Sequence, residues 1–141
     1  MKLSAKTEYA CLAMLQLAAD HDTGRPAPLK SLSAKQSIPE GFLVQILQDL
    51  RRAGLVVSTR GASGGYRLAR APEEVSLAEV VTATEGSVVP AEGSACSSPL
   101  AVALHSVCED LRHAQRRRLE SLSLAGLLER STVSNEPMWY I

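Results

Sequence analysis

Aromatic residues are scarce in this chain of 141 residues, which holds one Trp, three Tyr and one Phe. A platform for single-stranded nucleic acid needs aromatic side chains on which successive bases stack. The composition therefore excludes that class of binding surface. The chain is nevertheless 45% hydrophobic, which is enough to form the core of a globular domain.

Long apolar runs are also missing, and none approaches the roughly 20 residues that span a bilayer. The N-terminal stretch lacks a signal-peptide cleavage pattern. These absences predict a cytoplasmic protein with no membrane partner. Cysteine is limited to three residues, an odd number without framework spacing. This number fits a reducing compartment, where thiols are core residues, metal ligands or redox sensors.

An excess of charge of one sign is absent as well, because 15 Lys and Arg residues balance 15 Asp and Glu residues. The balance conceals a split between the two halves of the chain. Residues 1–70 hold ten basic against five acidic residues, and residues 71–141 hold five against ten. Attraction to phosphate depends on the local field and not on the whole-chain sum, so the first half can still bind a polyanion.

Residues 38–70 predict a helix that runs into a two-stranded hairpin. Pro39 suits the first turn of a helix and Gly54 ends it. Residues 55–59 and 66–69 are short runs of β-branched and apolar residues, and the glycines of the RGASGG turn between them permit positive φ angles. The apolar face of the helix is expected to consist of Phe42, Leu43, Ile46, Leu47 and Leu50.

The opposite face of this helix is free to approach the major groove of DNA. A helix that reads bases, beside a hairpin that contacts the backbone, makes a winged helix-turn-helix. Groove contacts are expected from Glu40, Gly41, Val44, Gln45 and Gln48, and phosphate contacts from Arg51, Arg52, Arg60 and Arg67. Further contacts are expected from Ser63 and Gly64, with weaker support for Lys2, Lys6 and Lys30. The alternative interpretation is a solvated helix end for Arg51 and Arg52 and an ordinary exposed side chain for Gln45.

Helical patterns flank this stretch. Ser4 is expected to cap a first helix that ends near Ala19 and carries Cys11 in the core. A short helix at 29–35 and a turn at 36–38 complete the helix-turn-helix. After the hairpin, Ser76 and Glu79 form a capping box that opens a helix to about residue 85. The expected fold is mainly α with a small β-hairpin wing.

Ser98 and Pro99 open the longest helical pattern, whose apolar positions are spaced as in a coiled-coil seam: Leu100, Leu104, Val107, Leu111, Ala114 and Arg118. A seam needs a partner, so we expect a homodimer. The expected divisions are a winged helix-turn-helix domain at 1–85, a flexible sensor loop at 86–98, dimerisation helices at 99–130, the second of them at 123–130, and a tail at 131–141.

Several segments together resemble the Rrf-two family of bacterial transcription regulators. They are the opening MKLSAKTEYACLAMLQLA, the helix IPEGFLVQILQDLRRAGLV, the wing STRGASGGYRLAR, SLAEVVTATEG and the late SLAGLL. The resemblance implies a homodimer that binds double-stranded DNA at a palindromic promoter site, with long C-terminal helices crossing in the dimer. In several members an iron–sulfur cluster beside the dimerisation helix controls DNA affinity.

Family members with a cluster carry three closely spaced cysteines, and this chain departs from that pattern. Only Cys96 and Cys108 lie in the region, and Val102 stands midway between them. By resemblance, Glu8 of the opposite protomer and either His105 or His113 would complete a mixed ligand set for a [2Fe-2S] or [4Fe-4S] cluster. The alternatives are a cluster-free thiol sensor and a protein without a cofactor.

The leading hypothesis is a homodimeric, sequence-specific repressor or activator that responds to a redox, iron or small-molecule signal. A winged-helix protein that only docks to other proteins is the alternative. The sequence contains no Ser/His/Asp set, phosphate-binding loop or zinc-spaced His/Cys cluster, so an enzyme is not expected.

Overall fold

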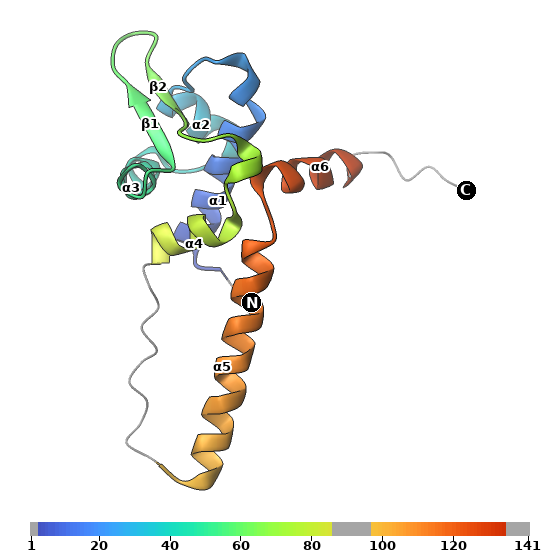
Figure 1. Cartoon of the computed structure of the whole chain (residues 1–141). Helices are drawn as coiled ribbons and strands as arrows, with labels where there is room; N and C mark the ends of the chain where they lie inside the picture. The colour runs from blue at the N-terminus through green and yellow to red at the C-terminus, as the bar shows by residue number, and fades with distance from the viewer. Residues whose placement is uncertain (1–2, 86–96, 135–141) are drawn as a thin grey trace, which may run out of the picture.

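The computed structural model describes residues 3–85 and 97–134. Its elements in chain order are α1 (Ala5–Ala19), η1 (His21–Thr23), α2 (Leu29–Gln36), α3 (Glu40–Arg52), β1 (Val56–Thr59), β2 (Gly65–Leu68), η2 (Pro72–Glu74), α4 (Leu77–Glu85), α5 (Pro99–Glu120) and α6 (Leu124–Ser134). The two strands form one antiparallel hairpin. The expected fold, mainly α with a small β-hairpin wing, is confirmed (Figure 1).

The core lies between α1 and α3. Ser4 caps α1 as predicted, because its hydroxyl accepts a hydrogen bond from the Thr7 backbone N–H at 3.2 Å. Cys11 is buried in the core, also as predicted. The central core side chains are fully enclosed and include Ala10, Met14, Leu43, Ile46, Leu47 and Leu50. Phe42 was predicted to lie on this buried face, and that prediction was wrong, since the residue is 39% exposed. Its ring packs edge-on against Tyr9 instead.

The wing begins where α3 ends, because Gly54 adopts a φ of 76° that a side chain would disfavour. β1 then pairs with β2 in a register that sets Val56 opposite Leu68. A third segment supports the hairpin from the other side. The Ala27 N–H donates to the Tyr66 carbonyl, and the Tyr66 N–H donates to the Ala27 carbonyl, both at 2.8 Å. The wing is thus tied to the segment that leads into α2.

The capping box of α4 is present as predicted. The Ser76 N–H donates to Glu79 Oε2 at 3.0 Å, and the Glu79 N–H donates to Ser76 Oγ at 3.3 Å. The other carboxylate oxygen of Glu79 lies 2.6 Å from Arg70 Nη2. Partial burial opposes ionisation of Glu79, but the hydrogen bonds from Arg70 and Ser76 and the charge of Arg70 together lower the pKa of this carboxyl. The end of the wing is therefore fixed to the start of α4.

The long helix α5 projects from this module, and α6 returns to it (Figure 1). Leu124, at the start of α6, is fully buried in the core, and its N–H donates to the Val75 carbonyl at 3.0 Å. Helix α6 continues to Ser134, beyond residue 130 where the predicted helix ends, and residues 135–141 of the predicted tail lie outside the described residues. The domain boundaries themselves stay a prediction. In the described residues no helix is both long and apolar enough to cross a membrane.

Candidate nucleic-acid interface

Helix α3 and the wing lie on the same side of the module, away from α6 (Figure 1). The strongly amphipathic sequence of α3 places its apolar residues in the core and leaves Gly41, Gln45 and Gln48 exposed. Val44 differs from these neighbours because it is half-buried. The outer face of α3 therefore presents two amide side chains, which can form hydrogen bonds with the edges of bases in a major groove.

Basic side chains surround this face. Arg51 at the end of α3, Arg60 at the wing turn and Arg67 on β2 are all exposed. Within residues 3–85 and 97–134, none of these three guanidinium groups forms an ion pair with a carboxylate. Arg52 differs, since its Nη1 lies 3.5 Å from Asp49 Oδ1. At least three arginines are thus available to phosphates.

The wing turn extends outward and does not fold onto the module. Ser63 is exposed and Gly64 is half-buried. The hairpin is tight at Gly64, because a Cβ built there would lie 2.1 Å from the Thr59 carbonyl oxygen. Lys2, a further expected contact, lies outside the described residues. The exposed hydroxyl of Ser63 remains a candidate donor to phosphate.

Two contacts between α1 and α3 were not found from the sequence. Lys6 Nζ lies 2.7 Å from Asp49 Oδ2, and the rings of Tyr9 and Phe42 meet with centroids 5.6 Å apart and planes at 78°. Both contacts join residues more than 30 positions apart in the sequence. No periodicity or local motif signals such a pair, so only the three-dimensional arrangement shows them.

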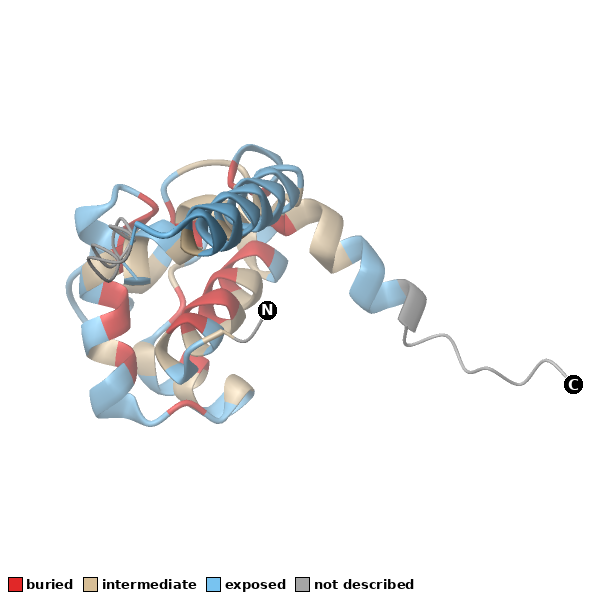
Figure 2. Ribbon diagram, turned by 90° about the horizontal axis from the view of Figure 1, so that it is seen from below, coloured by how far each residue is buried: buried red, intermediate tan, exposed pale blue. Residues whose placement is uncertain are grey.

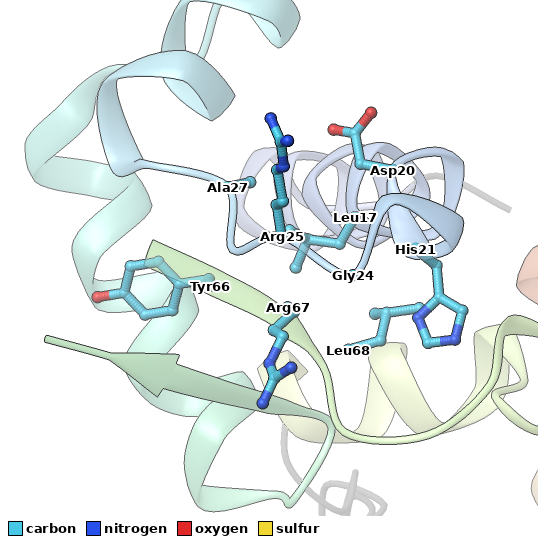
Figure 3. Close-up of a pocket in the computed structure, with 9 residues that line it drawn as sticks. All are labelled: Leu17, Asp20, His21, Gly24, Arg25, Ala27, Tyr66, Arg67 and Leu68. Carbon is cyan, nitrogen blue, oxygen red and sulfur yellow. The ribbon is translucent and has the colours of Figure 1, made fainter. Parts of the chain in front are cut away.

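A small cavity lies at the base of the wing, lined by Leu17, Asp20, His21, Gly24, Arg25, Ala27, Tyr66, Arg67 and Leu68. Its volume is about 90 Å³, well below the roughly 300 to 1,000 Å³ of typical small-molecule sites. Figure 3 shows the guanidinium groups of Arg25 and Arg67 pointing away from each other and the Tyr66 ring turned outward. The cavity is therefore a packing gap beside the hairpin, too small for a drug-sized ligand.

The expected cluster ligands do not gather in one chain. Cys108 is half-buried on α5, His105 is exposed one turn earlier, and Glu8 is exposed on α1. No group of three His, Cys, Asp or Glu side chains suited to a metal occurs among the described residues, and Cys96 lies outside them. A cluster needs about four ligands, so the described part of a single chain does not fit one.

Cys11 is not a candidate ligand or sensor. Burial, followed by the charges of Glu85 and Glu8, raises the pKa of its thiol to about 11. The reactive form of cysteine is the thiolate, and this thiol stays protonated at neutral pH. Its place in the core is structural.

Comparison with known proteins fits this geometry. Residues 3–130 match the family model Rrf2, described as an iron-dependent transcriptional regulator. An HTH-type transcriptional regulator of Synechocystis, slr0846, is 44% identical over 90 residues, which are 64% of this chain and 60% of that protein. The regulator CymR of Bacillus subtilis is 34% identical over 142 aligned positions, and the alignment covers 100% of this chain and 100% of CymR.

The solved structure of IscR from T. potens superposes with a TM-score of 0.80 at 33% identity, covering 96% of this chain and 91% of that one. The similarity extends over the winged helix, α5 and α6, because the family match reaches residue 130. The chain therefore belongs to the Rrf2 family of helix-turn-helix transcriptional regulators, which are DNA-binding proteins and not enzymes.

Proposed function

We propose that two copies of this chain associate through α5 and bind a palindromic duplex site. In this arrangement, α3 of each copy lies in a major groove and each wing lies against the backbone. The observation that carries the proposal is the outward face of α3, where Gln45 and Gln48 are exposed beside Arg51, Arg60 and Arg67. Amide groups address base edges, and arginines neutralise phosphates. The function is thus sequence-specific control of transcription.

In the proposed complex the two kinds of contact have separate roles. Gln45 can hydrogen-bond adenine through both atoms of its amide, and Gln48, Gly41 and Val44 lie on the same stretch of α3. The phosphate contacts come from Arg51, Arg52, Arg60 and Arg67, with Ser63, Gly64 and Lys2 at the wing and the N-terminus. Base contacts select the site, and the phosphate contacts supply most of the affinity.

The proposed dimer rests on the apolar seam of α5. The helix is 22 residues long and contains no buried residue, and Figure 2 shows it coloured as exposed along nearly its whole length. The exposed fractions are 83% for Leu100, 62% for Leu104, 54% for Val107 and 59% for Leu111. These side chains share one face at four- and three-residue spacing, which suits pairing with the same helix of a second copy.

A palindromic site follows from this symmetry. A two-fold axis between two α5 helices presents the two α3 helices in opposite orientations, and inverted half-sites match that presentation. The half-site spacing depends on how the two modules sit in the dimer.

The remaining part of the proposal concerns the signal to which the regulator responds and whether an iron–sulfur cluster detects it. The family model is described as iron-dependent, and the resemblance implies Cys96, Cys108, Glu8 and His105 as ligands. The described donors do not form such a set within one chain, so the proposed function includes no step through a cluster. An absorption spectrum of protein purified without air decides this point. Visible bands with bound iron would show that the protein holds a cluster, and a colourless preparation without iron after reconstitution would rule one out.

Arg60→Ala and Gln45→Ala test the proposed interface. We expect Arg60→Ala to weaken binding to every duplex and to reduce the slope of log affinity against log salt by about 1.8, one phosphate contact in each copy of the dimer. Gln45→Ala should weaken binding only to a preferred site, by about 1 to 3 kcal/mol for each half-site. The measurement is fluorescence anisotropy at several salt concentrations, with a duplex selected by the protein from a random pool and a scrambled duplex of equal composition.

Arg117→Ala is the control for charge. This arginine is exposed on α5, outside α3 and the wing, and its loss removes the same charge. An Arg60→Ala protein that behaves like Arg117→Ala would contradict the proposed phosphate contact. Binding that does not respond to salt in the unaltered protein would contradict the proposed interface as a whole.

A further inference from the structure

Asp49 holds two cations at the edge of the candidate interface. Its Oδ2 lies 2.7 Å from Lys6 Nζ on α1, and its Oδ1 lies 3.5 Å from Arg52 Nη1 on α3. Each carboxylate oxygen thus pairs with a different basic side chain. The Asp49 side chain is only 20% exposed, whereas those of Lys6 and Arg52 are 39% and 76% exposed. The carboxylate lies beneath two cations that can reach solvent.

The packing of α3 does not depend on these ion pairs. Leu43, Ile46, Leu47 and Leu50 are fully buried on the inner face of the helix, and each buried side chain of this kind contributes about 1.5 to 3 kcal/mol. An ion pair at a partly exposed site contributes roughly 0 to 1 kcal/mol. The contribution of Asp49 to stability is therefore small beside that of the core.

Asp49 nevertheless lies where a carboxylate opposes the proposed function. It follows the exposed Gln48 directly and lies one helical turn after Gln45. A negative charge at this place repels phosphates and reduces the positive charge that Lys6 and Arg52 offer to DNA. The direct effect of its charge on DNA is therefore to lower affinity.

We propose that Asp49 is a specificity-determining residue, which restrains Lys6 and Arg52 and so limits binding to DNA that lacks the preferred site. This inference rests on the proposed DNA interface. Binding to random sequence consists almost entirely of phosphate contacts. When Lys6 and Arg52 are not held by Asp49, their side chains can move to contact phosphates wherever the protein lies along the duplex. Releasing them therefore strengthens binding to random sequence.

Binding to the preferred site gains less from that release. There the base contacts of α3 fix the register, so Lys6 and Arg52 can reach only the phosphates that this register places near them. Specificity is the difference between two binding free energies, and an element that weakens the wrong complex more than the right one increases it. Asp49 acts in this way through charge alone.

Asp49→Asn tests the inference, because it removes the charge and keeps the size of the side chain. The matched control is Glu129→Gln, which removes one negative charge from the exposed surface of α6, away from α3 and the wing (Figure 1). The full chain is titrated with the selected duplex and the scrambled duplex at four salt concentrations. Thermal unfolding of each variant is followed in parallel.

For Asp49→Asn we expect binding to the scrambled duplex to tighten about 3-fold or more. We also expect the salt slope to steepen by about 1.8 to 3.6, one or two phosphate contacts in each copy of the dimer. The ratio of the affinity for the selected duplex to that for the scrambled duplex should fall about 2-fold or more relative to Glu129→Gln, because the selected duplex gains less. Adding Lys6→Met to Asp49→Asn should reduce the salt slope again by about 1.8, since Lys6 is one of the released cations in each copy.

Three results separate the possibilities. An unchanged affinity ratio, with Asp49→Asn equal to Glu129→Gln, overturns the inference and leaves the proposed interface intact. Weaker binding to both duplexes together with a lower unfolding temperature also overturns it, because Asp49 then acts by holding α3 on α1. If the unaltered protein does not distinguish the two duplexes, the proposed function fails first, and the inference fails with it.

Discussion

Gly65→Ala is expected to detach the wing from the module and to lower DNA affinity by about 30-fold or more, since the wing phosphate contacts depend on its position. Gly65 has a φ of 154°, and a Cβ at this residue would lie 2.3 Å from the Ala27 carbonyl oxygen and 2.8 Å from the Pro28 nitrogen. Backbone atoms cannot yield as a flexible side chain would. The collision therefore pushes β2 away from the segment that leads into α2.

The local loss can be estimated from the contacts. The two hydrogen bonds between Ala27 and Tyr66 are each worth about 0.5 to 1.5 kcal/mol. The forced backbone conformation adds about 1 to 3 kcal/mol. We therefore expect the free energy of unfolding to fall by about 2 to 6 kcal/mol, measured by urea denaturation, and DNA affinity to be measured at a concentration where the variant is folded.

Gly24→Ala is the matched control, because Gly24 has a φ of 66° and no atom within 4 Å of an added Cβ. It carries a backbone penalty of about 1 to 2 kcal/mol without a collision and should retain DNA affinity. A folded Gly65→Ala protein that binds duplex DNA as Gly24→Ala does would show that the position of the wing is unimportant for binding.

The parts of the fold that local chemistry determines were predictable. Gly54 ends α3 because few other residues adopt its positive φ, and Ser76 with Glu79 opens α4 through hydrogen bonds between residues three apart. Both signals can be recognised from a few adjacent residues in the sequence. The same holds for the cap at Ser4 and for the glycines of the wing turn. The order of helix and hairpin follows from such signals, whereas the family was inferred from the resemblance of whole segments and is shown by comparison.

Contacts between distant segments were not predictable. Phe42 has the spacing of a core residue, but the edge of the helix at this position faces Tyr9 and solvent. Asp49 lies three residues before Arg52 on the same helix, but its second ion pair, with Lys6 of α1, joins segments that are far apart in the sequence. Helical spacing gives the face of a residue and not its neighbours on other elements. The structure was therefore needed to identify which basic side chains are available to DNA.

Leu104→Asp is expected to convert the proposed dimer to a monomer. Leu104 lies at the middle of the α5 seam and is 62% exposed in the single chain, so the substitution removes no contact from the core of the module. In a dimer it replaces two buried leucines, each worth about 1.5 to 3 kcal/mol, and adds two carboxylates that lose hydration. The dimer dissociation constant should rise about 100-fold or more, measured by sedimentation equilibrium.

In this variant, binding to a palindromic duplex and binding to a single half-site should respond differently. Affinity for the selected palindromic duplex should fall about 100-fold or more, because linking two modules raises the affinity of the pair by a factor of that order. Affinity for a duplex with one half-site should stay the same, since α3 and the wing are unaltered. Unfolding of the module should also stay the same, which distinguishes lost pairing from lost folding.

Ser106→Asp provides the charge-matched control. Ser106 is exposed on α5 and lies about 125° around the helix from the centre of the seam, as follows from 100° per residue. This variant adds the same charge to the same helix and should remain a dimer. If Leu104→Asp and Ser106→Asp sediment alike, the apolar face of α5 does not pair two copies. The two-fold presentation of α3 would then need a different interface, and the palindromic site would lose its structural reason.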